Sequence, residues 1–159
     1  MSPMRRLLCV AAAAGFGCAA KLPALSPGSA VPEGARKTGV AILVSPAQFQ
    51  EGWAWRFDGV DYSLGVDDRG AVRFLSTRST KVMTKEGVHV GQSFSDVQRV
   101  EGMRVVAWPG WGYVVELPSG WNAAFFLGSS MTEREPVAED AVAQLFRGTA
   151  AGYGARAKD

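Results

Sequence analysis

Few residues of this 159-residue chain have side chains that could act as a nucleophile or a base. His89 is the only histidine, and it stands between two valines in an alternating stretch that is typical of a strand edge. Ser93 or Ser95 could join Asp96 and His89 in a hydrolytic triad, but their spacing does not require that arrangement. The Gly-x-Ser-x-Gly pattern that exposes a nucleophilic serine is also missing. We therefore predict no catalytic residues and no enzyme.

Four aspartates stand around two predicted turns, and carboxylates in such a group could bind calcium or form the acid pair of a glycosidase: Asp58, Asp61, Asp67 and Asp68. Aspartate is also common in turns because its side chain accepts hydrogen bonds from local backbone amides. The segment 67–70 lacks the alternating oxygen ligands of a calcium loop. With one histidine and no cysteine after Cys18, a zinc site is excluded as well. We expect no metal and no cofactor.

Aromatic residues are the most unusual feature of the chain. Trp108, Trp111 and Tyr113 surround one tight turn that contains Pro109-Gly110. Exposed rings at a turn can stack on sugars, hold an apolar ligand or act as hot spots of an interface. Rings are equally good core residues, and we favour packing for the other three tryptophans. Both interpretations stay open for the turn, which we predict as the ligand or partner surface.

The N-terminus predicts export. Arg5 and Arg6 precede an unbroken run of apolar or small residues from Leu7 to Gly17. A basic segment before an apolar run of about 7–15 residues is typical of a secretory signal peptide, and such a run is too short to span a bilayer. A helix of the folded core would carry polar residues on one face, and this run has none. We therefore assign residues 1–17 to a signal peptide.

The segment Gly15-Phe16-Gly17-Cys18 resembles the lipobox of bacterial lipoprotein precursors. The resemblance implies cleavage before Cys18, acylation of its sulfur and a lipid anchor in the membrane. Gly17 matches the family's pattern, whereas Gly15 stands where the family usually has leucine. An unmodified exported thiol would also be open to oxidation, which favours a use for Cys18. The alternatives are ordinary cleavage at a small-x-small site, such as after Ala20, which would release a soluble protein, and a segment that stays uncleaved as an anchor.

Processing changes the charge and the cysteine content of the chain. Loss of Arg5 and Arg6 reduces Lys+Arg from 17 to 15, which equals the 15 Asp+Glu, so no nucleic-acid partner is expected. Cys9 is lost with the signal, so the mature chain has no internal disulfide. Residues 18–37 combine the lipidated cysteine with a stretch rich in Pro, Ser, Gly and Ala, which predicts a flexible tether. A loosely packed arm on the domain is the alternative.

Short apolar runs separated by turn residues predict one domain over residues 38–148. We expect strands over 40–44, 53–57, 62–66, 71–75, 103–108, 112–117 and 121–127, the second to fourth of which form a meander. Ser93 and Asp96 have capping-box spacing and predict a short helix. Apolar residues at helical spacing from Val137 to Phe146 predict a longer one. The expected fold is α+β, with an antiparallel sheet of about six short strands, one short helix, one longer C-terminal helix and a frayed tail over 149–159.

Together these features predict a lipid-anchored protein of the cell envelope, held at the cell membrane or outer membrane by Cys18. Its small non-catalytic domain would bind an envelope protein or ligand, without nucleic acid. One alternative is a soluble periplasmic or secreted binding or inhibitor domain. Another is an enzyme that acts on an envelope polymer through carboxylates.

Overall fold

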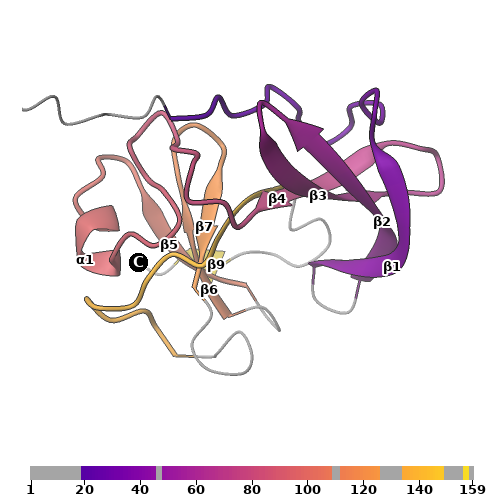
Figure 1. Cartoon of the computed structure of the whole chain (residues 1–159). Coiled ribbons are helices and arrows are strands. Elements are labelled where there is room, and N and C mark those ends of the chain that lie inside the picture. Colours follow the sequence, from indigo (N-terminus) through magenta and orange to yellow (C-terminus); the bar gives the residue numbers. More distant parts are fainter. Residues whose placement is uncertain (1–18, 46–47, 109–111, 126–133, 149–155, 158–159) are drawn as a thin grey trace, which may run out of the picture.

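The computed structural model describes residues 19–45, 48–108, 112–125, 134–148 and 156–157. Regular structure in these residues is almost entirely β (Figure 1). The strands are β1 (Arg36–Ser45), β2 (Gln48–Phe57), β3 (Val60–Val66), β4 (Val72–Thr77), β5 (Arg104–Trp108), β6 (Gly112–Glu116), β7 (Asn122–Ala124), β8 (Gln144–Gly148) and β9 (Arg156–Ala157). Within the described ranges the one helix is α1 (Phe94–Val97). No helix there has the length and apolar character needed to cross a bilayer.

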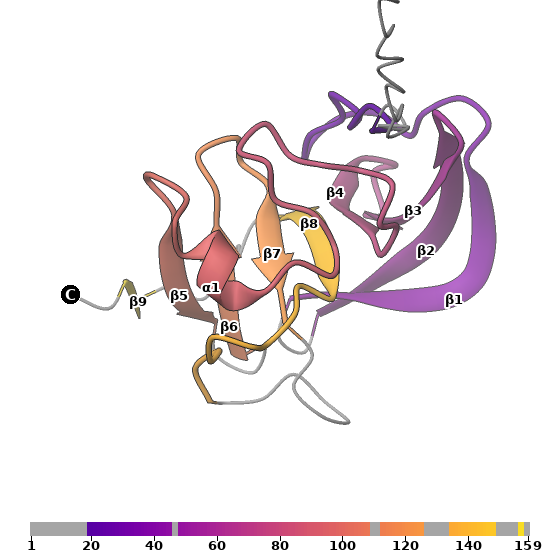
Figure 2. The ribbon, with the colours of Figure 1, turned by 60° about the vertical axis from the view of Figure 1, so that its left-hand side comes forward.

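The strands form a single antiparallel sheet in the order β1-β2-β3-β4-β8-β7-β6-β5-β9. Strands β1 to β4 are a meander, and β5 to β7 form a second meander. The late strand β8 enters between β4 and β7 and joins the two halves, as Figure 2 shows. The segments nearest the middle of the sheet are thus far apart in the sequence.

The predicted α+β class is wrong, because the expected C-terminal helix is irregular chain followed by β8. Leu145 and Phe146 are both fully buried and belong to apolar clusters on opposite faces of the sheet. A central strand covered on both faces has consecutive apolar residues, and over a short segment this pattern resembles helical spacing. The sheet also has nine strands in the described residues, where about six were expected.

Other local predictions are confirmed. The meander over 53–75 corresponds to β2, β3 and β4 paired in antiparallel register. Ser93 is the N-cap of α1, and its hydroxyl accepts a hydrogen bond from the backbone N–H of Asp96 at 3.3 Å. Strand period and capping chemistry therefore identify these elements from local sequence alone.

Two apolar clusters hold the sheet, one on each face. The larger lies under α1 and the connecting loops and includes Leu75 and Leu145. The smaller includes Phe74, which stacks on Phe146 with 5.6 Å between ring centroids. Adjacent residues of the central strands thus point into different clusters, which leaves β4 and β8 almost without a solvated face.

Two glycines let β1 cross closely over the sheet. A Cβ atom on Gly65 would lie 2.5 Å from Cγ1 of Val44, and one on Gly52 would lie 2.2 Å from the carbonyl oxygen of Val40. Both distances are far below ordinary van der Waals contact. Small residues on β2 and β3 therefore create the space into which β1 packs.

Residues 19–35, which we call the arm, lie along the upper edge of the molecule in Figure 1. The N–H of Ala20 donates to the carbonyl of Lys81 at 2.8 Å, and the N–H of Gly28 donates to that of Val72 at 2.7 Å. Leu22 and Leu25 pack against the larger cluster. This part of the predicted tether thus contacts the domain, as the alternative of an arm describes, and β1 begins directly after it.

Candidate functional site

The predicted aromatic surface at 108–113 is only partly described. Trp108 is 4% exposed and meets Phe146 edge-on at 5.5 Å, so its ring belongs to the smaller cluster. Tyr113 is half-buried in β6, opposite Ala107. Trp111 and the predicted lipidation site Cys18 lie outside the described residues. Trp108 therefore offers no exposed ring to a ligand.

A different aromatic surface lies where the arm passes over β2 and β8. It is an open cavity of about 710 Å³, which we call the arm cleft. Residues 21–25 of the arm line it on one side. Three rings and three basic side chains also line it, and these are Trp55, Phe57, Trp121, Lys21, Lys85 and Arg147.

The rings of the arm cleft come from one face of β2 and from the residue directly before β7. Alternate positions of a strand share a face, so Trp55 and Phe57 lie side by side, with their ring centroids 5.1 Å apart. Both are partly buried, whereas Trp121 is only 2% exposed. The partly open rings offer the flat apolar surface on which a ring or an apolar group packs.

Arg147 crosses the cleft and joins the arm to the sheet. Its guanidinium donates to the carbonyl oxygens of Leu25 at 3.3 Å and Ser119 at 2.9 Å. It also lies 5.0 Å from the ring centre of Trp121, a cation–π contact. Burial lowers the pKa of Arg147, and the carboxylate of Glu86 partly offsets that effect. The side chain remains a cation at neutral pH, because the pKa of arginine begins far above that range.

Glu86 is the acidic group next to this cation. Burial favours its neutral form, but hydrogen bonds outweigh burial and hold the pKa of Glu86 below its usual value. The carboxylate accepts the backbone N–H of Ser119 at 2.6 Å and its hydroxyl at 2.8 Å. Lys21 and Lys85 make no ion pair with any part of the chain that the structure describes. The cleft therefore keeps an excess of positive charge.

The residues considered for catalysis are not assembled into a triad. His89 Nδ1 lies 3.1 Å from the carbonyl oxygen of Val90, and no hydrogen bond joins His89 to Ser93, Ser95 or Asp96 in the described ranges. The two serine hydroxyls lie 2.9 Å apart at the start of α1, where Ser93 also bonds the carboxylate of Asp96. These groups serve the helix cap.

Two of the four clustered aspartates, Asp67 and Asp58, have separate structural roles. Asp67 accepts the backbone amides of Arg69 at 3.0 Å and Ala71 at 2.8 Å, which is the turn role expected from composition. Asp58 instead accepts the backbone N–H of Lys21 at 2.7 Å and so fixes the start of the arm. Neither arrangement positions a pair of acids around a common substrate site.

Comparisons of the chain with family models, with curated proteins and with solved structures give no match. A functional interpretation therefore rests on the residues themselves. Sequence reasoning missed the arm cleft because its lining comes from five separate segments. The available signal was the alternation of Trp53, Trp55 and Phe57, which puts three rings on one face of a single strand.

Proposed function

We propose that this chain is an exported, lipid-anchored binding protein of the bacterial cell envelope, whose domain binds an anionic ligand with an apolar or ring-shaped body in the arm cleft. The observation that carries the proposal is that the partly buried rings lie beside Lys21 and Lys85, two cations that form no ion pair with a described residue. Rings supply contact area, and cations select a negative group. The domain acts by binding and not by catalysis.

The structure of the arm supports processing at Cys18 over processing after Ala20. Ala20 forms a parallel bridge with Val82, and its N–H donates to Lys81. Cleavage after Ala20 would remove both contacts from the mature protein. Cleavage before Cys18 retains them and leaves the cysteine at the new N-terminus, where the lipobox-like segment predicts acylation.

The anchor is tested by intact-mass analysis of protein extracted from membranes. We expect a mature N-terminus at Cys18 with added acyl mass. A mature N-terminus at Lys21 without acyl mass would overturn the anchor and leave a soluble binding domain.

The cleft is tested with anilinonaphthalene sulfonate, a fluorescent probe that has an aromatic body and one negative charge. We expect one site per chain, and the double variant Trp55→Ala/Lys85→Gln weakens binding at least about tenfold through lost ring area and lost charge. The matched control is Trp53→Ala/Arg99→Gln, which removes one ring and one cation that do not line the cleft. Equal weakening by both variants would refute the assignment of this site.

A further inference from the structure

A hairpin next to the start of the arm presents a basic ridge. From Lys81 to Lys85 the side chains alternate between exposed and buried positions, with Val82 only 1% and Thr84 4% exposed. Lys81, Met83 and Lys85 are therefore the exposed residues of this segment, and Met83 is 45% exposed. An antiparallel bridge between Met83 and His89 closes the hairpin. We call these three exposed residues the ridge.

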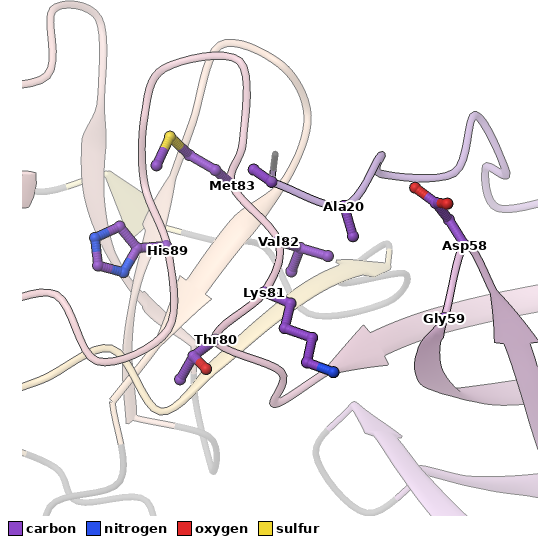
Figure 3. Close-up of a pocket in the computed structure, with 9 residues that line it drawn as sticks. Ala20, Asp58, Gly59, Thr80, Lys81, Val82, Met83 and His89 are labelled. Carbon is purple, nitrogen blue, oxygen red and sulfur yellow. The ribbon is translucent and has the colours of Figure 1, made fainter. Parts of the chain in front are cut away.

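The chain that follows Cys18 is fixed beside the ridge. Ala20 pairs with Val82, and the next residue donates its backbone N–H to the Oδ2 atom of Asp58 at 2.7 Å. Figure 3 shows Ala20 between the 81–83 segment and Asp58. Two consecutive residues are therefore held from opposite sides, by the hairpin and by the turn between β2 and β3.

This attachment leaves only a very short segment of chain between an acyl group on Cys18 and the domain. Consecutive Cα atoms are about 3.8 Å apart, so two residues of chain before Ala20 can span at most about 8 Å. A free tether of twenty residues would instead allow an average separation of roughly 25 Å. An acyl group on Cys18 must therefore bring the bilayer surface close to the hairpin.

The chemistry of this surface fits a lipid headgroup layer. Three of the chain's five lysines are found here, at positions 21, 81 and 85, and none forms an ion pair with a described residue. Lysines near an anionic bilayer favour contact, each by about fivefold. Met83 stands between Lys81 and Lys85 and adds a flexible apolar side chain suited to the interface.

From this geometry we infer that the ridge and Lys21 form a membrane-docking surface that binds the headgroups of anionic phospholipids once Cys18 is acylated. The inference rests on the lipid anchor of the proposed function. It adds an orientation, in which the ridge faces the bilayer surface. The arm maintains this orientation because it restricts the movement of the domain relative to the anchor.

The test uses the acylated full-length protein in vesicles of phosphatidylglycerol and phosphatidylcholine that contain a headgroup-attached nitroxide quencher. A fluorophore is attached to Met83→Cys or, as the control, to Phe49→Cys, since acylated Cys18 leaves one free thiol in either variant. Phe49 is 67% exposed and lies eight strand positions, or about 26 Å, from Phe57, the last residue of β2 before Asp58. We expect strong quenching at position 83 and little at position 49.

Charge is tested by adding Lys81→Gln and Lys85→Gln to the labelled protein. The ratio of docked to undocked domain should fall about fivefold for each lysine removed. The matched control Arg69→Gln, on the exposed turn before β4, should leave it unchanged. Quenching that is equal at positions 83 and 49, or unaltered by the lysine changes, would overturn the docking surface. Mass analysis of the same samples separates the two proposals, because acylated protein without docking refutes only this one, and unacylated protein refutes the anchor on which it rests.

Discussion

Because β1 packs closely on Gly65, we predict that a larger residue at position 65 destabilises the protein. The backbone of Gly65 does not adopt a positive φ, so alanine fits the local conformation and only space opposes it. The new Cβ would lie 2.5 Å from Cγ1 of Val44 and 3.2 Å from the Cβ of Phe74. Since carbon atoms pack at about 3.5–4.0 Å, the side chain of Val44 must move by about 1 Å.

The size of the effect follows from this overlap. Overpacking of this kind costs about 1–3 kcal/mol, and we expect about 2 kcal/mol for Gly65→Ala. Val44→Ala removes two buried methyl groups, worth about 1.6 kcal/mol, and leaves a small cavity, so it should cost about 2–2.5 kcal/mol. In the double variant the new methyl group enters space that Val44 has vacated. Its cost should therefore be close to that of Val44→Ala alone, with a coupling energy of about 2 kcal/mol between the two sites.

Urea denaturation followed by tryptophan fluorescence measures all four proteins, each in the same Cys18→Ser background. Equal m values would show that the changes act on stability and not on the extent of unfolding. If the double variant loses the sum of the two single losses to within about 0.5 kcal/mol, the sites are independent. That result would refute the packing of Val44 onto Gly65 and, with it, the position of β1.

Two further predictions concern titratable groups. The hydroxyl of Tyr62 is buried without a hydrogen-bond partner in the described ranges, and burial, followed by the charge of Asp58, raises the pKa of Tyr62 to about 12. Tyr62→Phe should therefore leave the free energy of unfolding unchanged or raise it by up to about 1 kcal/mol, and a clear loss in urea denaturation would contradict the unpaired hydroxyl. The backbone N–H of Ala71 and then the guanidinium of Arg73 lower the pKa of Asp67 in the folded protein. The ionised carboxylate therefore stabilises the folded state above about pH 4, and this stabilisation is lost as the pH falls through the pKa of Asp67 in the folded state. Asp67→Asn should lower stability at neutral pH and flatten the decline of the urea midpoint below about pH 4, whereas an unchanged pH profile would contradict the role of this carboxylate.

Elements with one solvated face could be predicted from sequence. In β3 the residues Tyr62 and Leu64 alternate with the exposed Asp61 and Ser63, and that period identifies a strand directly. The N-cap of α1 could also be predicted from sequence, because Ser93 and Asp96, which form it, are only three positions apart. In both cases the chemistry that fixes the element lies within the element.

Elements buried on two faces could not be predicted in the same way. Strand β8 is apolar at consecutive positions because β4 and β7 flank it and a cluster covers each face. Trp108 is buried for a similar reason, since Phe146 of β8 lies beside it. The contact of Trp108 with Phe146 joins residues nearly 40 positions apart, and the pairing of β4 with β8 joins residues about 70 positions apart, so no local sequence pattern indicates them. The arm cleft could not be predicted for the same reason, because the segments that line it come together only when β8 pairs within the sheet.

Arg147 shows how one residue can stabilise the fold and still contribute to binding. A cation on a central strand needs partners, and the carbonyl oxygens of Leu25 and Ser119 supply them. These two hydrogen bonds use two of the five N–H donors of the guanidinium. The same side chain lines a cavity that also contains partly buried rings and two lysines that form no ion pair with a described residue. The contact that fixes the arm therefore also positions a planar cation over the cleft, so the arm and the proposed ligand site depend on the same side chain.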